Sequence, residues 1–309
     1  MPMDDLETLC DELITLADCV RWGASRFGEA GLSFGHGTDN AFDEAWALTM
    51  HVLSLPFDTP APYLASRLTR AERRRVLAML QRRVDERRPA AYLTGEAWFA
   101  GLPFRVDERV LVPRSPIAEL IEERFAPWLA EPDRVGRILD LGTGSGCIAI
   151  ACAFAFPAAR VDAVDVAGAA LEVARENVRR HALEERVTAL RCDLFEALGD
   201  TRYDLIVSNP PYVTRAAMAS LPEEYRHEPA EALAAGEDGL DVILRILDAA
   251  GAHLAPEGLL VGEVGDAAAA LEQARPDLPF AWPEFRRGGH GVFVLAARDL
   301  DAARGNGER

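Results

Sequence analysis

The sequence predicts an α/β protein in which a mostly parallel sheet with one antiparallel strand follows an N-terminal helical domain. From residue 135 onward, short apolar segments typical of buried strands alternate with helix-like segments, which indicates a sheet covered by helices on both faces. Residues 1–90 instead repeat apolar side chains at three- and four-residue steps, as amphipathic helices do. A chain of 309 residues is long enough for two domains.

Composition narrows the classes of function. The formal net charge is −17, which argues against bulk attraction to nucleic acid or to an anionic membrane. All 33 basic residues are arginines, which excludes Schiff-base chemistry and phosphate loops that need a lysine. No apolar run could span a membrane and the first residues do not resemble a signal peptide, so we expect a cytoplasmic protein. The five cysteines show no zinc-binding spacing, so we expect buried thiols and no metal.

The predicted helical domain, residues 1–90, ends in an arginine-rich segment. Residues 67–88 carry nine arginines against three acids. The apolar residues of this segment form one helical stripe that would leave the arginines on a solvated outer face; they are Val76, Leu77, Leu80 and Val84. The alternative is a local contact with ribosomal RNA or an acidic partner, because a basic patch attracts anions over about one Debye length even in an acidic protein. Upstream, Thr38, Asp39 or Asn40 is expected to cap a helix over Ala41 to Leu55.

Residues 91–116 are expected to link the two domains as a β-hairpin. Aromatic and β-branched residues recur here in short extended runs, including Tyr92-Leu93 and Val110 to Val112, and Gly95 and Gly101 provide turns. The linker ends in a rigid loop, Pro113-Arg114-Ser115-Pro116, ahead of a predicted helix.

Residues 117–297 are assigned to the α/β domain. Strands are predicted over Arg137 to Leu141, Arg160 to Val164, Val187 to Arg191, Tyr203 to Val207 and Leu259 to Val264. Helices are predicted over Ile117 to Leu129, from Cys147 through Ala155, over Ala167 to His181, over Leu240 to His253, and in a short segment ending at Ala274. A last hairpin, Phe280 to Arg286 with His290 to Leu295, would supply the antiparallel strand. The polar residues 298–309 are expected to form a disordered tail.

Three successive predicted strands end in residues suited to an adenosine-containing cofactor. The first is followed by a glycine loop that allows close approach of a ligand, Gly142-Thr143-Gly144-Ser145-Gly146. Asp165 ends the second strand, where a carboxylate can accept both hydroxyls of a ribose. After the third, Asp193 could accept from the adenine amino group, with Leu194 and Phe195 as apolar cover. Without a lysine-bearing phosphate loop, S-adenosylmethionine fits this pattern better than ATP.

A rigid loop after the fourth strand offers a site for a planar nitrogen group. Ser208-Asn209-Pro210-Pro211-Tyr212 stops the strand, because proline has no N–H for a sheet ladder. The side-chain carbonyl of Asn209 and the backbone carbonyl of Pro210 can accept both protons of an NH₂ group, while the Tyr212 ring covers its plane. The loop therefore predicts binding of an amide or of an exocyclic amine.

Together these motifs resemble the class I S-adenosylmethionine-dependent methyltransferases of the N(5)-glutamine type, the HemK-like proteins. The resemblance covers nearly the whole chain, including the Pro113-Arg114 loop, Glu228-Pro229 and residues 236–239. It implies a Rossmann-like class I methyltransferase sheet and transfer of a methyl group to the side-chain amide nitrogen of a glutamine. The implied cofactor is S-adenosylmethionine, which leaves as S-adenosylhomocysteine.

The resemblance also implies a role for each matching residue. The loop from Gly142 to Gly146 would lie against the methionine moiety, Asp165 would hold the ribose, and Asp193 with Leu194 would flank adenine. Asn209 to Tyr212 would bind the substrate glutamine, with Asn209 also adjoining the cofactor. Asn209, Pro210 and Tyr212 are thus the implied catalytic residues.

The loop after the hairpin favours one branch of this family. Release-factor enzymes usually read P-R-x-D/E-T-E there, whereas Pro113 to Glu119 lacks both the acid and the threonine. With the loop Phe34 to Asn40, this resembles the branch that methylates large-subunit ribosomal protein L-three, as free protein or within a ribosome-assembly intermediate. Leu194 stands where release-factor enzymes can carry an aromatic residue.

Three alternatives remain at the level of the sequence. The substrate glutamine could belong to a peptide chain release factor. The same loop could grip an adenine N6 amine, although no basic recognition domain interleaved with aromatic residues separates the motifs. Finally, a non-enzymatic ribosome-assembly module could retain S-adenosylmethionine only for stability.

Overall fold

The computed structural model describes the backbone of residues 3–307 and the side chains of residues 6–303. The chain forms two compact units. One comprises the chain up to Glu96 together with Pro222–His227, and the other comprises Ala97–Leu221 and the chain from Glu228 onward. No helix in the described part of the chain is long and apolar enough to cross a membrane.

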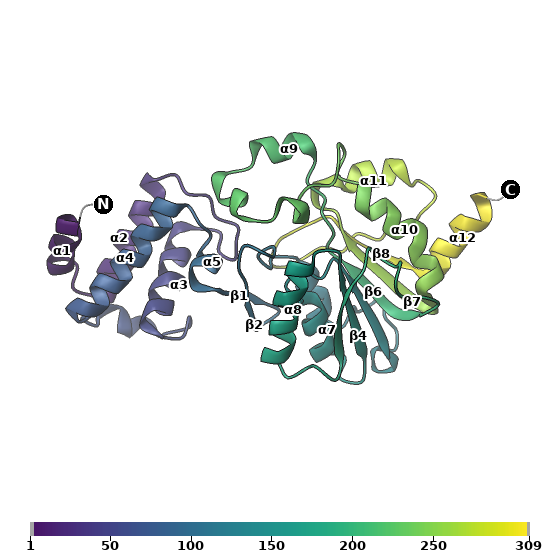
Figure 1. Ribbon diagram of the computed structural model, residues 1–309, viewed down its shortest axis with the longest axis horizontal. Helices are drawn as coiled ribbons and strands as arrows, with labels where there is room; N and C mark the ends of the chain where they lie inside the picture. Colours follow the sequence, from purple (N-terminus) through teal and green to yellow (C-terminus); the bar gives the residue numbers. More distant parts are fainter. Residues whose placement is uncertain (1–2, 308–309) are drawn as a thin grey trace. The chain divides into compact units, whose positions relative to one another are not determined.

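The first unit is helical, as its apolar periodicity predicts (Figure 1). Its elements are α1 (Met3–Glu12), α2 (Leu16–Glu29), α3 (Ala41–Leu53), the 3₁₀ turn Ala61–Ala65, α4 (Arg70–Glu86) and α5 (Ala90–Thr94). Side-chain oxygens of Thr15, Asn40 and Thr69 cap α2, α3 and α4 by accepting from backbone N–H groups. Among the three residues expected to cap α3, Asn40 does so.

The arginines of α4 do not all lie on an outer face, so that prediction is wrong for Arg83. Its side chain is 0% exposed and its Nε donates to Glu44 at 2.6 Å. The reason is periodicity, because Arg83 stands one heptad after the buried Val76 and shares its stripe. Other arginines of the helix pair with acids of the same unit: Arg70 and Arg74 with Glu7, and Arg82 with Glu86. These ion pairs favour the interpretation of the arginines as a solvated helix face over a contact with RNA or an acidic partner.

The predicted linker hairpin is present but shorter than expected. Strands β1 (Glu96–Phe99) and β2 (Leu102–Arg105) pair with each other. Tyr92 and Leu93, expected to be extended, lie in α5, and residues 110–112 form a loop instead of a strand. Short apolar runs are compatible with a helix as well as with a strand. Tyr92 and Val112 are buried, which explains why these runs are apolar although they are not strands.

The second unit contains a six-stranded sheet in the order β5-β4-β3-β6-β7-β8, which confirms the predicted fold class. Only the β7–β8 pair is antiparallel. The strands are β3 (Arg137–Leu141), β4 (Arg160–Asp165), β5 (Val187–Arg191), β6 (Tyr203–Ser208), β7 (Leu254–Glu263) and β8 (Val292–Ala296). The helices are α6 (Ile117–Glu122), α7 (Cys147–Ala155), α8 (Gly168–Arg180), α9 (Arg215–Ser220), α10 (Asp241–His253), α11 (Ala268–Ala274) and α12 (Ala297–Gly307).

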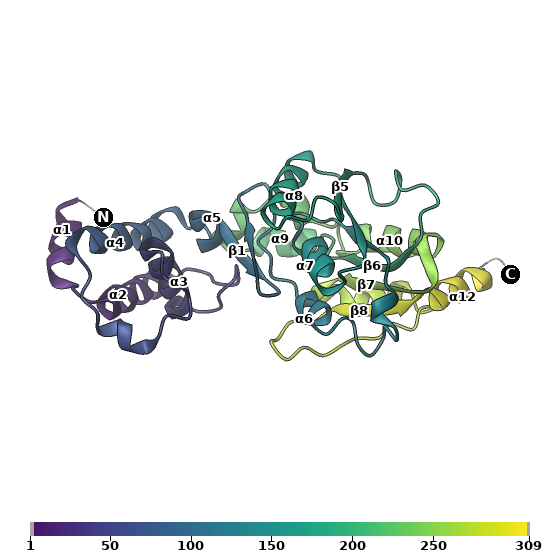
Figure 2. The same cartoon turned by 90° about the horizontal axis from the view of Figure 1, so that it is seen from below.

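Helices cover both faces of this sheet (Figure 2). Alternate strand residues point to opposite sides, so Ile138 and Val207 pack in the core with α6, α7 and α8, whereas Leu139 and Ile206 pack in the core with α10, α11 and α12. The five cysteines are buried free thiols, as expected.

Several boundaries in this unit differ from the predictions. The strand predicted from Leu259 already begins at Leu254. The helix from Ile117 ends at Glu122, because Arg124 and Phe125 adopt positive φ and the N–H of Phe125 bonds back to Leu120. The segment 280–286 is not a strand, although Ala281 forms an isolated bridge with Val294. The C-terminal tail is not disordered over its described part, because α12 buries Leu300 in the core beside α10. Residues 308 and 309 lie outside the described residues.

Candidate active site

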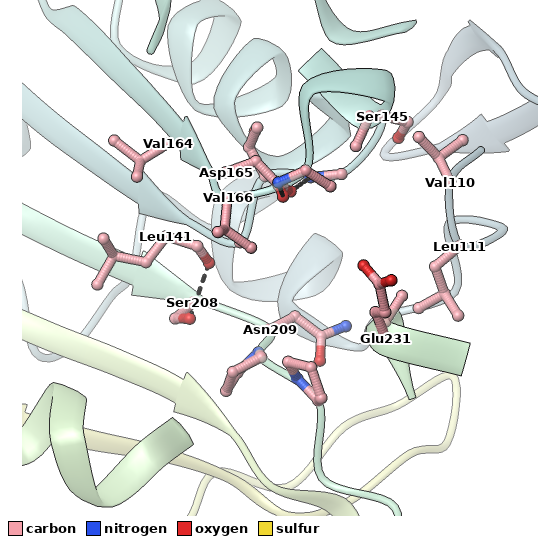
Figure 3. Close-up of a pocket in the computed structure, with 18 of the residues that line it drawn as sticks. Val110, Leu111, Leu141, Ser145, Val164, Asp165, Val166, Ser208, Asn209 and Glu231 are labelled. Carbon is pink, nitrogen blue, oxygen red and sulfur yellow. Dashed lines mark hydrogen bonds between the residues drawn. The ribbon is translucent and has the colours of Figure 1, made fainter. Parts of the chain in front are cut away.

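The strand order places two predicted loops at neighbouring strand ends. The chain runs outward from β3 through β4 to β5 and then returns to β6 on the other side of β3, so β3 and β6 flank the point where the order reverses. In open α/β sheets, ligands bind at such a switch point. Leu141 pairs with Ser208 in the parallel register, and Ser208 Oγ donates to the Leu141 carbonyl at 2.8 Å (Figure 3). The glycine loop and the Asn209 loop therefore begin side by side.

A cavity of about 340 Å³ lies at this edge of the sheet, within the size range of small-molecule sites. It is lined by the residues predicted from the sequence to contact a cofactor or substrate, namely Gly142, Thr143, Gly144, Ser145, Asp165, Asp193, Leu194, Asn209, Pro210 and Pro211. Three predicted residues, Gly146, Phe195 and Tyr212, are not among the lining residues.

The glycine loop has a backbone that needs glycine. Gly142, Gly144 and Gly146 all have φ between +54° and +81°. At Gly146 an added Cβ would also lie 3.3 Å from the Cβ of Ala174 in α8, so this glycine shapes the loop by close packing and not by lining the cavity.

Asp165 ties the second strand end to the glycine loop. One carboxylate oxygen accepts from the Gly144 N–H at 2.9 Å and the other from the Ala167 N–H at 2.8 Å. Burial raises the pKa of Asp165, while these backbone N–H groups oppose the rise. Each oxygen keeps a lone pair, and Figure 3 shows the side chain at the cavity beside Val166.

Asp193 and Leu194 form the third strand-end contribution. Asp193 Oδ2 accepts from Arg245 Nη2 at 2.9 Å, so its acceptor capacity is shared with a cation from α10. Leu194 has φ +50°, which turns the chain directly after Asp193 and brings the leucine to the cavity.

Asn209 and Pro210 line the cavity, whereas Tyr212 is directed elsewhere. Figure 3 shows Asn209 on the cavity side, facing Glu231. The Tyr212 hydroxyl donates to Glu263 Oε1 at 2.9 Å, and its ring lies against Gly265. The Tyr212 ring, which was expected to cover the plane of the substrate amide, therefore does not line the cavity.

Asp140 is a buried carboxyl group beneath the glycine loop. Its Oδ2 accepts from Thr143 Oγ1 at 2.6 Å and from the Ala149 N–H at 3.1 Å, while Oδ1 has no hydrogen-bond partner within the described residues. Burial raises the pKa of Asp140 to about 7, because a carboxylate is poorly solvated there.

We expect Asp140→Asn to increase the free energy of unfolding more at pH 8 than at pH 5. The asparagine carbonyl can accept both existing hydrogen bonds without burying a charge. As pH rises from 3.8 toward 7, the unfolded wild-type chain loses its proton before the folded chain does, so folding becomes less favourable. The loss between pH 5 and pH 8 should be roughly 2.5 kcal/mol. Urea denaturation at both pH values measures it, and an unchanged difference between variant and wild type would contradict the assignment.

Sequence reasoning missed several lining residues from other segments. Val110 and Leu111, expected in a strand, line the cavity from a loop, and Glu231 and Arg245 line it from segments beyond the Asn209 loop. The Glu228-Pro229 motif was the one sequence feature that pointed to this part of the cavity. Glu228 binds Arg114 through both carboxylate oxygens at 2.6 and 2.8 Å and also accepts from the Val112 N–H, so it holds the proline-arginine loop at the cavity.

No group of three or more His, Cys, Asp or Glu residues that could hold a metal ion occurs among the described residues.

Comparison with known proteins identifies the family. Residues 124–262 match the methyltransferase small domain family. The chain is 55% identical to the ribosomal protein uL3 glutamine methyltransferase of Xanthomonas campestris pv. campestris, over 94% of each chain. It is 52% identical to the protein of that name from Bordetella pertussis, over 94% of this chain and 97% of that one. A solved methyltransferase from Pyrococcus furiosus is 20% identical over 64% of this chain and 89% of that chain, with a TM-score of 0.46. The chain, with its methyltransferase domain, belongs to the family of ribosomal protein uL3 glutamine methyltransferases.

Proposed function

We propose that this protein transfers a methyl group from S-adenosylmethionine to the side-chain amide nitrogen of a glutamine in ribosomal protein uL3, the L-three protein. The observation that carries the proposal is the pairing of Leu141 with Ser208, which starts the glycine loop and the Asn209 loop at the same level of one cavity. Relatives over 50% identical along almost the whole chain carry this name.

The charges around the cavity fit a cofactor without phosphate groups. Three arginines line it, and each is paired with a carboxylate of its own unit: Arg109 with Asp107, Arg114 with Glu228, and Arg245 with Asp193. Paired guanidinium groups are poor receptors for phosphate, whereas Asp165 and the nearby Glu231 favour a positively charged ligand. When bound, S-adenosylmethionine supplies an electrophilic methyl group on a sulfonium.

Asn209 and Pro210 would activate the substrate amide. An amide nitrogen is a poor nucleophile, because its lone pair is delocalised into the carbonyl. Accepting both N–H protons at the Asn209 side-chain carbonyl and the Pro210 backbone carbonyl returns electron density to nitrogen and fixes its direction. The N–CH₃ bond forms as the sulfonium S–CH₃ bond breaks, S-adenosylhomocysteine leaves, and one amide proton, made acidic as the bond forms, is released to water. Positioning can provide up to ~7–11 kcal/mol of rate enhancement in ideal cases.

We expect Asp165→Ala to weaken S-adenosylmethionine binding by roughly 10- to 100-fold. The substitution leaves two ribose hydroxyls without an acceptor in a partly buried site and also releases the Gly144 N–H. Titration calorimetry measures the change, and Asp165→Asn, which keeps one carbonyl acceptor, should give a smaller loss. Wild-type affinity in the alanine variant would show that the ribose site has been misplaced.

The choice of one glutamine requires a larger surface than the amide itself. We propose that the helical domain, residues 1–90, recognises uL3, either free or in a ribosome-assembly intermediate. Between Arg26 and Arg67 the chain has no lysine or arginine but exposes Phe42 and Phe57, so this stretch suits a basic protein segment. The α4 arginines remain the proposed place for a local contact with ribosomal RNA, although several are already paired with acids. A ribosomal substrate would place the enzyme in the cytoplasm.

Single-turnover methyl transfer to purified uL3, followed by mass spectrometry of its peptides, tests the proposed function. A mass increase of one methyl group on a glutamine of uL3 is the expected result. Release factors and an adenine-containing oligonucleotide are the comparison substrates, and methylation of either in place of uL3 would overturn the assignment. Binding of S-adenosylmethionine without transfer to any of them would favour the non-enzymatic alternative.

A further inference from the structure

Glu263 is a buried carboxylate that joins two segments of the candidate active site. It is the last residue of β7 and is 4% exposed. Its Oε1 accepts from the Tyr212 hydroxyl at 2.9 Å and its Oε2 from Ser115 Oγ at 2.5 Å. Tyr212 follows the Asn209-Pro210-Pro211 loop, and Ser115 lines the cavity beside Arg114. Burying a carboxylate destabilises the fold unless its oxygens accept hydrogen bonds, and both oxygens of Glu263 do so.

Glycines close the space around Tyr212 on two further sides. A Cβ added at Gly265 would lie 2.7 Å from the tyrosine ring, and one added at Gly239 would lie 2.3 Å from the Tyr212 carbonyl oxygen. Both glycines also have positive φ. The ring and the backbone of Tyr212 are therefore held by close contacts, and the Glu263 hydrogen bond fixes the remaining freedom of the side chain.

Ser115 is held just as closely. Besides donating to Glu263, its Oγ accepts from the Ile117 N–H at 3.2 Å at the start of α6. The adjacent Arg114 is paired with Glu228. Glu263 thus links the Asn209 loop on one side of the cavity to the proline-arginine loop, while Glu228 links that loop to the segment after α9.

We propose that Glu263 is a positioning residue for the methyl-transfer step, acting through Tyr212 and Ser115. This inference rests on the proposed function. By anchoring Tyr212, Glu263 fixes the loop two residues upstream, where the Pro210 carbonyl and the Asn209 side chain would hold the amide. Loosening that anchor should misdirect the amide nitrogen without removing any group that touches the cofactor.

The test compares Glu263→Leu and Glu263→Gln in methyl transfer to uL3. Leucine removes both acceptors, and we expect kcat to fall at least 100-fold while the KM for uL3 and the affinity for S-adenosylmethionine change less than threefold. Glutamine can accept from one hydroxyl and donate to the other, so it should restore kcat to within tenfold of wild type. Wild-type kcat in the leucine variant, or no rescue by glutamine, would overturn the proposal.

Tyr212→Phe keeps the inference testable if Glu263→Leu does not fold. This variant removes only the hydroxyl and should lower kcat roughly tenfold. Tyr203→Phe is a matched control, because the Tyr203 hydroxyl also donates to a carboxylate, Asp162, at 2.9 Å and does not line the cavity. Equal effects of the two substitutions on kcat would reduce Glu263 to a structural role. Absence of transfer by the wild type would refute the proposed function instead, so the two failures are distinguishable.

Discussion

Asn209→Ala is expected to lower kcat for methyl transfer by roughly 10²- to 10³-fold, which corresponds to about 3–4 kcal/mol of transition-state stabilisation. The substitution removes one of the two acceptors proposed for the amide protons and leaves the Pro210 carbonyl in place. The acceptor matters most as the bond forms, because the nitrogen then becomes more acidic and its hydrogen bonds strengthen. The loss should therefore appear in kcat more than in the KM for uL3.

Cofactor binding distinguishes this role from a contribution to the cofactor site. Asn209 lines the same cavity as Asp165, so a purely cofactor-binding role would weaken S-adenosylmethionine on substitution. We expect its affinity, measured by calorimetry, to stay within a few-fold of wild type. A loss of affinity as large as the loss of kcat would contradict the assignment of Asn209 to the substrate.

The sequence predicts the part of the site that follows from strand ends. The glycine loop, Asp165, Asp193 and Asn209 each stand at or just after the end of a predicted strand, and parallel strands bring their carboxyl ends to one edge. Local pattern therefore carries enough information to bring ten of the predicted residues to one cavity.

The remaining contacts depend on residues far apart in the chain. Tyr212 and Glu263 are separated by 51 residues, and Arg114 and Glu228 by 114, so nothing in the local pattern indicates that they meet. Glu263 ends an apolar run that reads as an ordinary buried strand. The prediction for Tyr212 was that its ring contacts the substrate. In the structure its hydroxyl instead donates to Glu263 and its ring packs against Gly265.

In the helical domain, the contacts of Arg83 likewise could not be predicted from the local sequence. The composition of α4 suggests a solvated basic face, but Arg83 is enclosed by partners from three other segments. Besides Glu44, its Nη2 donates to the Ser33 carbonyl at 3.1 Å, and its Nη1 lies 3.6 Å from a carboxylate oxygen of Glu224. Glu224 belongs to Pro222–His227, which the chain supplies to the helical unit from a point after the Asn209 loop. Only tertiary structure could reveal this pairing.

Arg83→Ala is accordingly expected to destabilise the protein by about 3–5 kcal/mol, because removing one member of a buried ion pair leaves the other charges without compensation. The matched control is Arg82→Ala in the same helix turn, whose side chain is 49% exposed and pairs with Glu86 four residues on. An exposed pair of this kind contributes about 0.3–0.5 kcal/mol. Urea denaturation followed by circular dichroism measures both. The two substitutions change helix propensity equally, so a difference between their losses of stability reports the environment of the guanidinium group. Equal losses would show that the buried carboxylates of Glu44 and Glu224 do not need Arg83 for charge compensation.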